Sequence, residues 1–215
     1  MLISEIRDNI AQHFGKSLDI PFKSRVQSEI ISARGEVIKQ HFQKYGTYPE
    51  SLVAQINSTP TLSVDIAENN NISLGENVKK TVEIIPTPIR MSNRNSNFIY
   101  VGAIDGKTSF SYIQPETYED IKHDRFSKNS IYYTYINNHI YIYGTCPKNI
   151  RIRLIAADPY EVAVLNGESE ENCPQYLEIP EDFVQLIERM IIELISRSFV
   201  KPEPEEEIKI EEDND

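Results

Sequence analysis

The spacing of apolar residues changes twice along the chain, and these changes constrain the fold more than any other feature. Up to about residue 56, apolar residues recur at intervals of three and four, which is typical of amphipathic helices. From Asn57 the interval becomes two, and β-branched and aromatic residues predominate, as in strands. The helical interval returns at Ile179 and continues to Val200. A strand-rich segment therefore lies between two helical ends.

We accordingly predict an α+β fold in which the N- and C-terminal helices pack together and carry an inserted antiparallel β domain of about six or seven strands. The expected divisions are a helical part over 1–56, a β-rich domain over 57–165, a loop and long helix over 166–200 that complete the helical part, and an acidic extended tail over 201–215.

The N-terminal part predicts two helices. An apolar stripe at spacings of three and four marks a short first helix: Ile3, Ile6, Ile10 and Phe14. A longer helix is predicted over Ser24 to Tyr45, with Ser24 and Gln27 as a capping box and Gly46 at its C-terminal end. Pro49 to Ile56 are expected to add one or two further helical turns.

The middle of the chain predicts short strands separated by polar turns. The expected strands are Thr61 to Ile66, Val78 to Ile85, Phe98 to Ala103, Thr108 to Ile113, Ile131 to Ile136, His139 to Tyr143 and Ile150 to Ala156. The strongest signal is a hairpin around Asn137 and Asn138, because asparagine tolerates the positive φ that a two-residue turn requires.

The last predicted helix carries an unusual apolar pattern. Pro180 suits a first-turn position, and Glu181 and Asp182 complement the helix dipole. On a helical wheel, Ile192 and Phe199 fall within the polar arc. A monomer has little reason to place them there, so we predict that they contact another protein.

Five tyrosines alternate over both faces of the predicted hairpin: Tyr132, Tyr133, Tyr135, Tyr141 and Tyr143. We expect these side chains to contact another subunit, because aromatic residues on a second face suggest a second contact. An ordinary sandwich core is the alternative. A base-stacking platform is a weaker alternative, since no Lys or Arg lies between Ser130 and Cys146.

Catalytic, metal and cofactor sites are not predicted. Asp120, His123 and Asp124 lie within five residues but lack a remote further ligand, so a polar turn or a helix end is the preferred interpretation. His41 lies on an apolar helix stripe, where a hydrogen-bonded core histidine is more common than a ligand. Cys146 and Cys173 are too few for a disulfide framework. The protein is expected not to be an enzyme.

The charge of the chain disfavours a nucleic-acid grip. The formal net charge is -11, whereas DNA binding depends on clustered Lys and Arg. Most of this charge is in the tail, which includes Glu205, Glu206 and Glu207. The tail is expected either to be disordered or to dock along a partner subunit. The sequence shows no export signal and no apolar stretch long enough for a membrane span.

One resemblance rests on the late part of the chain. The order NNHIYIYGTCPKNIRIRLIAADPYEV and then YLEIPEDFVQLIERMIIELISR combines a hairpin around an NN turn, an IRI strand, a DP pair and an IPED helix start. Over residues 130–198, with support from the helix at 24–45, this resembles the head-to-tail adaptor or ring proteins of short-tailed bacteriophages, crAss-like and tail tubular protein A type. The acidic tail and the two CP dipeptides depart from the pattern.

The resemblance implies a structural virion protein at the head-tail junction, made in the host cytoplasm. It implies a ring of self-copies, commonly twelve, that contacts the portal protein and neighbouring tail or ring proteins, with genome DNA passing through without specific binding. Ring subunits need two different contact surfaces, which the tyrosines, Ile192, Phe199 and the tail could supply. The alternative is a small soluble phage or host-takeover module that binds or regulates without catalysis.

Overall fold

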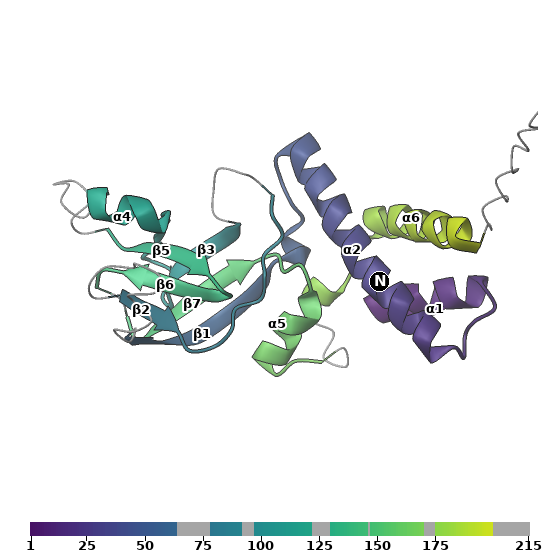
Figure 1. Cartoon of the computed structure of the whole chain (residues 1–215), viewed down its shortest axis with the longest axis horizontal. Coiled ribbons are helices and arrows are strands. Elements are labelled where there is room, and N and C mark those ends of the chain that lie inside the picture. Colours follow the sequence, from purple (N-terminus) through teal and green to yellow (C-terminus); the bar gives the residue numbers. More distant parts are fainter. Residues whose placement is uncertain (64–77, 92–96, 122–129, 146, 170–174, 200–215) are drawn as a thin grey trace, which may run out of the picture.

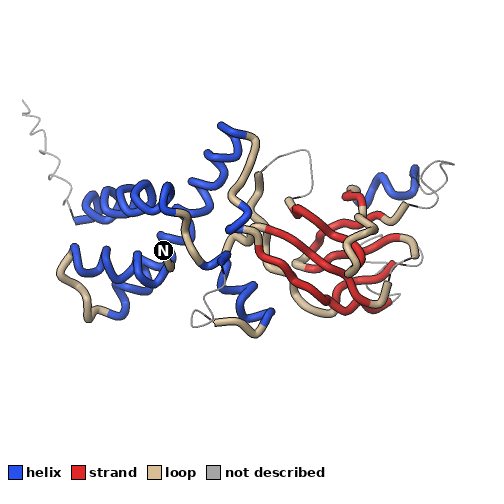
Figure 2. The backbone as a smooth tube through the Cα atoms, turned by 180° about the vertical axis from the view of Figure 1, so that it is seen from behind, coloured by secondary structure: helices blue, strands red, loops and turns tan. Residues whose placement is uncertain are grey.

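The structure is a computed structural model that describes the chain except residues 64–77, 92–96, 122–129, 146, 170–174 and 200–215. It is an elongated α+β molecule, with a helical part at one end, a β-sheet at the other, and helix α2 reaching between them (Figure 1). The view from behind shows the same separation of helices and strands (Figure 2). The predicted α+β class, with terminal helices packed together and a β domain inserted, is confirmed.

The helical part is built from both ends of the sequence. Its helices are α1 (Ile3–His13), α2 (Ile20–Tyr45) and α6 (Glu181–Phe199). Their apolar stripes share one core, in which Ile6, Ile30 and Ile187 are fully buried. The first residues are fastened to the segment before α6, because the Ile179 N–H donates to the Met1 carbonyl at 2.8 Å.

The start of α2 differs from the prediction. The Asp19 carboxylate accepts a hydrogen bond from the Phe22 N–H at 3.0 Å, and Pro21 occupies the first turn. Ser24 is therefore inside the helix, and the predicted capping box is wrong. The predicted C-terminal end is confirmed, since Gly46 adopts a φ of 69° and its N–H donates to the Phe42 carbonyl at 2.8 Å.

The sheet has seven strands among the described residues, in the order β3-β7-β1-β2-β6-β5-β4. The strands are β1 (Ala54–Ser63), β2 (Val78–Thr81), β3 (Phe98–Ala103), β4 (Ser111–Tyr112), β5 (Tyr132–Ile136), β6 (His139–Tyr143) and β7 (Asn149–Leu154). All described neighbours pair antiparallel except β4 and β5, which are parallel.

Strand β1 joins the two halves of the sheet. Its first part pairs with β7, and Thr61 to Ser63 pair with β2, with a register shift between Ile56 and Thr59. Such an irregularity bends a strand and lets the sheet curl. The segment Pro49 to Ile56 is predicted to be helical. In the structure, its helical part is limited to the 3-10 turn Glu50–Leu52, and β1 already begins at Ala54.

The predicted hairpin is confirmed. Asn137 and Asn138 have φ values of 50° and 62°, and β5 and β6 pair with Tyr133 opposite Ile142. Two described helices lie within the segment expected to be β-rich: α4 (Pro115–Ile121) and α5 (Pro159–Asn166). The Asp158 carboxylate caps α5 by accepting from the Tyr160 N–H at 2.9 Å, and Gly167 ends it with a φ of 68°.

Two extended segments connect the sheet to the helical part. The chain after β2 runs beside the chain after β7, where Ile89 N–H donates to the Ile155 carbonyl at 2.8 Å and Ala157 N–H donates to the Thr87 carbonyl at 2.8 Å. Helix α2 lies against this pair, and its buried Arg34 contacts Ala156. The junction is therefore hydrogen-bonded rather than a loose linker.

Candidate subunit interface

The tyrosine hairpin is covered on both faces by its own chain. Tyr133 is buried in the main core of the sheet, and Tyr141 and Tyr143 are buried on the other face with Val78 and Ile113. These three side chains are core residues of a single chain, which is the alternative that the sequence left open. They offer almost no surface to another subunit in this conformation.

The other two tyrosines are half-buried. The Tyr135 hydroxyl lies 3.1 Å from the Ile85 carbonyl oxygen and 3.0 Å from the Asn138 side-chain oxygen, and its ring packs edge-on against Phe98. Burial is the main cause that raises the pKa of Tyr135. Tyr132 packs beside the cluster of Tyr141 and Tyr143. The exposed parts of Tyr132 and Tyr135 remain candidates for contact.

Helix α6 exposes apolar side chains beside its core stripe. Ile191 and Ile195 are buried against the helical core, whereas Leu186 and Leu194 are exposed. Ile192, which the sequence singled out, is half-buried. Phe199 is the last residue of α6, but its side chain lies outside the described residues, as do Glu205, Glu206 and Glu207.

A groove between α2 and α6 has a volume of about 690 Å³ and is here called the α2–α6 groove. Its apolar lining comes from four segments and includes Ile31, Ala33, Ile89, Ala157, Met190, Ile191 and Leu194. Glu29, Glu36, Lys39 and Arg90 supply charges of both signs along it. The sequence analysis did not find it, because no local pattern brings these four segments together.

A second groove, the α5 groove, lies between α5 and the chain that follows β2 and has a volume of about 600 Å³. Its lining includes Ile84, Pro86, Tyr160, Val164 and Leu165. Val164 and Ile84 are exposed over 81% and 65% of their surface. The charged residues of this groove are all acidic: Glu83, Asp158 and Glu161. The groove therefore combines apolar and negatively charged lining residues.

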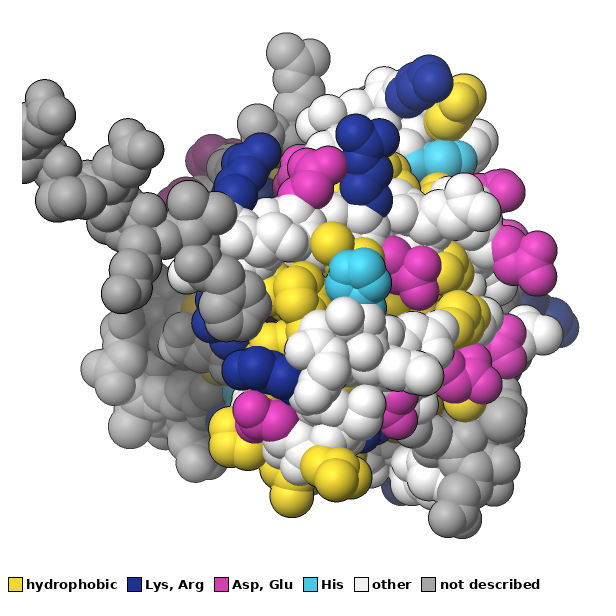
Figure 3. Space-filling model, turned by 90° about the vertical axis from the view of Figure 1, so that its right-hand side faces the viewer, with side chains coloured by type: hydrophobic (Ala, Val, Ile, Leu, Met, Phe, Trp, Pro, Cys, Tyr) yellow, Lys and Arg dark blue, Asp and Glu magenta, His cyan; other side chains and the backbone are white. Residues whose placement is uncertain are grey.

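The segment that connects α1 to the first residue of α2, residues 14–20 and here called the α1–α2 turn, projects apolar side chains into solvent. Leu18 is 96% exposed and Ile20 is 78% exposed. Figure 3 looks onto the helical end and shows hydrophobic side chains gathered at its lower edge, where this turn lies in Figure 1. The sequence analysis did not single out these residues, although the apolar pair in KSLDIPF lies outside the stripe of either helix.

The residues considered for chemistry are dispersed. Asp120 is exposed on α4, which agrees with the interpretation as a helix end, while His123 and Asp124 lie outside the described residues. The His41 ring packs against Phe183 at 5.3 Å, and its Nδ1 lies 3.0 Å from the Thr47 carbonyl oxygen. Within the described ranges no three His, Cys, Asp or Glu residues form a group that could hold a metal ion.

The Tyr176 hydroxyl, in the 3-10 turn Gln175–Leu177, donates a hydrogen bond to the carboxylate of Glu168, which follows α5. Burial, together with the Glu168 carboxylate, raises the pKa of the Tyr176 hydroxyl well above its usual range. The pair fastens the end of α5 to the segment that leads into α6. No helix in the described part of the chain is long and apolar enough to cross a membrane.

A fold that leaves several apolar surfaces uncovered is typical of a protein that works through contacts with other proteins. Comparison with known families specifies this class, since the model of phage tail ring protein 2 (CrAss_Ring_2) matches residues 1–213. The chain belongs to this family of crAss-like phage ring proteins. A comparison with curated proteins gave no match.

Membership of this family defines the role at a coarse level. The chain is a structural phage protein of the virion, it associates with its own copies in a ring, and it contacts neighbouring tail proteins. The uncovered apolar surfaces described above are therefore candidates for these contacts.

Proposed function

We propose that the chain is an adaptor subunit of the head-to-tail connector, where twelve copies form a ring between the portal protein and the tail. The ring surrounds the channel through which the genome passes. It acts through shape and contact and carries out no reaction.

The observation that carries this proposal is the presence of several apolar surfaces on one chain. The α2–α6 groove and the α5 groove both border Asp158 at the junction, whereas the α1–α2 turn lies at the far end of the helical part. A ring with cyclic symmetry is closed by heterologous contacts, in which one surface meets a different surface of the next copy. A connector ring needs a further surface for the proteins above and below it. Three apolar surfaces meet this requirement.

Residues on α6 and beyond are proposed to supply the contacts above or below the ring. Leu194 is 47% exposed and Ile192 is partly exposed, so both lie on the side of α6 that the helical core does not fully cover. Phe199 and the acidic residues Glu205, Glu206 and Glu207 follow at the end of α6. Together they form one continuous stretch of the chain that can reach the portal protein.

The acidic balance of the chain supports a position around a DNA channel. A net charge of -11 produces a negative potential that repels phosphate groups. A surface that repels DNA lets the genome slide past without specific binding.

The test is purification of the chain together with the portal protein of the same phage, followed by electron microscopy of the complex. We expect a ring of twelve subunits stacked on the portal. A chain that stays monomeric and never binds the portal would favour the alternative, a soluble phage module. A ring found elsewhere in the tail would contradict the adaptor position but agree with the family.

A further inference from the structure

The most exposed large hydrophobic side chains of the described residues lie on two surfaces. Among the described residues, the four most exposed large hydrophobic side chains are Leu18 at 96%, Val164 at 81%, Ile20 at 78% and Ile84 at 65%. The first and third form the α1–α2 turn, and the other two line the α5 groove. Isolated exposed hydrophobic residues are common, but pairs concentrated in this way mark contact sites.

The α1–α2 turn is held rigidly by its own hydrogen bonds. The Lys16 N–H donates to the Ala11 carbonyl at 2.8 Å, and the Asp19 N–H donates to the Lys16 carbonyl at 3.0 Å. Gly15 makes the turn possible with a φ of 66°. Beneath it, the rings of Phe14 and Phe22 pack edge-on at 5.9 Å. Leu18 and Ile20 are thus presented outward by a fixed backbone, which lowers the entropy lost on binding.

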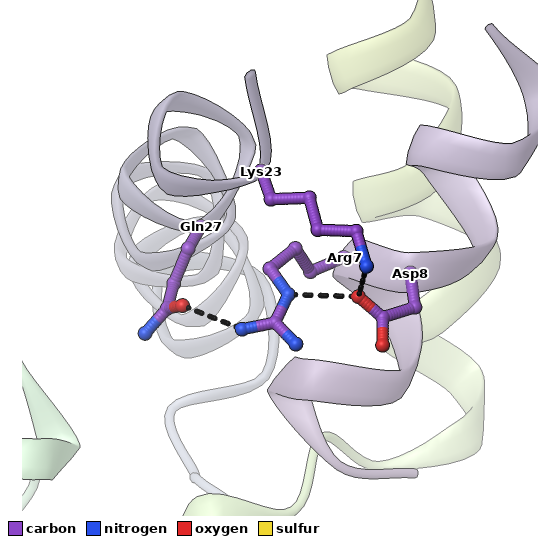
Figure 4. Close-up of polar contacts among 4 residues, drawn as sticks. All are labelled: Arg7, Asp8, Lys23 and Gln27. Atoms are coloured by element: carbon purple, nitrogen blue, oxygen red, sulfur yellow. Dashed lines mark hydrogen bonds and ion pairs between the residues drawn. The ribbon is translucent and has the colours of Figure 1, made fainter. Parts of the chain in front are cut away.

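Polar contacts also fix α1 against α2 below this turn (Figure 4). The Asp8 carboxylate accepts hydrogen bonds from Arg7 Nε at 2.9 Å and pairs with Lys23 Nζ at 3.1 Å. Arg7 Nη1 donates to the Gln27 side-chain oxygen at 3.1 Å. These contacts bridge the two helices, so the turn moves with the helical part as one body.

The α5 groove matches the turn in apolar character and complements it in charge. Its lining is apolar and includes Ile84 and Val164, and its charged residues are negative: Glu83, Glu161 and Asp158, whose carboxylate also caps α5. The turn is convex and apolar, and it carries Lys16 on one side and the exposed Arg25 one helical turn beyond Pro21. Asp19 on the turn is occupied as the cap of α2 and pairs with Lys16 at 3.8 Å. Apolar and acidic lining residues together favour an apolar partner with basic neighbours.

The two surfaces of one chain cannot meet. The α1–α2 turn lies at the far end of the helical part, and α5 lies beside the junction with the sheet (Figure 1). The same separation is seen from behind (Figure 2). A second copy of the chain can bring its turn to this groove, and repetition of that contact builds a head-to-tail series.

We propose that the α1–α2 turn of one subunit docks into the α5 groove of the next subunit and that this contact closes the ring. Leu18 and Ile20 pack against the exposed Ile84 and Val164, and Arg25 lies opposite Glu161. This inference rests on the association of the chain with its own copies, and it specifies which surfaces meet.

The test is cross-linking in a full chain in which Cys146 and Cys173 are replaced by Ser. The variant that combines Leu18→Cys with Val164→Cys should, under mild oxidation, give a ladder of linked chains on a denaturing gel. Each single variant should give dimers at most. The matched control combines Leu18→Cys with Leu62→Cys, because Leu62 is also exposed, at 58%, but lies near the end of β1, whereas α5 contacts β1 near its beginning, at Gln55. Mass spectrometry should identify a peptide in which residues 18 and 164 are joined.

The same cross-linking is done with the assembled connector that contains the portal protein. A ring that yields no more ladder than the Leu62 control overturns the proposed contact while the ring itself stands. A chain that forms no ring even with the portal contradicts the proposed function as well. The two failures are thereby distinguished.

A charge exchange provides a second measurement. Arg25→Glu or Glu161→Arg alone should weaken association of the chains about tenfold, and the two together should restore most of it. Both residues are exposed, so neither change should prevent folding. Equal loss in the single and double variants would contradict the pairing of these surfaces.

Discussion

Arg34 Nη1 on α2 donates a hydrogen bond of 3.0 Å to the carbonyl oxygen of Ala156, in the segment that follows β7. The guanidinium is buried, and among the described residues its Nε and Nη2 have no hydrogen-bond partner. Burial lowers the pKa of Arg34 to about 10, and the nearby Asp158 carboxylate partly opposes this shift. One side chain thus joins the helical part to the exit of the β-sheet.

Arg34→Ala is expected to lower the free energy of unfolding by about 2–4 kcal/mol, because it leaves a cavity and an unpaired buried carbonyl. Arg34→Met removes the same charge and hydrogen bond but retains most of the side-chain volume. Its free energy of unfolding should therefore fall by about 2 kcal/mol less than that of Arg34→Ala. Urea unfolding of both variants checks this. Equal destabilisation by the two changes would show that packing at this position contributes little.

Gly102→Ala is expected to destabilise the sheet by about 1–3 kcal/mol. An added Cβ on Gly102 would overlap the Thr108 carbonyl oxygen and the hydroxyl of Tyr100, which bridges the Ala103 and Thr108 carbonyls. Gly35→Ala is the matched control, because a Cβ there meets nothing within 4 Å. Since α2 gains helix propensity, the control should be stabilised by about 0.5–1 kcal/mol. Thermal unfolding measures both, and a destabilised control would show that its site is more crowded than the structure indicates.

Ile192→Glu is expected to leave the isolated chain folded, with a change in the free energy of unfolding within about 1 kcal/mol, and to abolish assembly with the portal. Its neighbour provides the control. Ile191 is buried in the helical core, so Ile191→Glu should unfold the helical part. Circular dichroism and sedimentation separate the two outcomes. Unfolding by Ile192→Glu would identify Ile192 as an ordinary core residue.

Asp8→Asn should remove a small acid-sensitive contribution to stability. Hydrogen bonds from Arg7 and from Lys23 hold the pKa of Asp8 below its usual value of 3.8. Because this pKa is depressed in the folded chain, the contribution is present above about pH 4 and is lost as the pH falls through the folded pKa. Asp8 is half exposed, so the effect should be below about 1 kcal/mol. Unfolding measured at pH 7 and pH 2.5 checks this, and an equal difference between the variant and the parent chain at both values would contradict it.

Local chemistry made part of the fold predictable. The predicted limits of β3 and β6 agree with the structure, and the turn between β5 and β6 follows from two residues that accept positive φ. The limits of α6 follow from its apolar interval and from the acidic residues of its first turn. In each case the signal lies within a few consecutive residues.

Two helical features were missed or misplaced in the sequence analysis, because other local signals competed with them. Helix α5 has a capping Asp158, a first-turn Pro159 and a final Gly167, but it is only 8 residues long and contains β-branched residues. The start of α2 was misplaced because Ser24 and Gln27 fit a capping box, although Asp19 and Pro21 fit the true start equally well.

The contact surfaces could not be predicted, because they depend on long-range packing. Tyr141 and Tyr143 are buried by Val78 and Ile113, which are distant in sequence. The two grooves likewise bring together segments separated by many residues. The structure shows that the apolar stripes of α1 and α2 are buried in the helical core without any contribution from Leu18, which leaves Leu18 exposed.

The backbone hydrogen bonds between Met1 and Ile179 affect when, during synthesis, the subunit can first assemble into a ring. These residues are 178 positions apart, and α6 completes the core that α1 and α2 share. Contacts between such distant residues form late, and domains fold as units while synthesis proceeds. We expect the β-sheet to fold first on the ribosome, with the helical part remaining sensitive to protease until α6 emerges, which arrested chains of increasing length would show. Only a finished chain would then present a rigid α1–α2 turn, so the order of synthesis would itself keep incomplete subunits out of the ring.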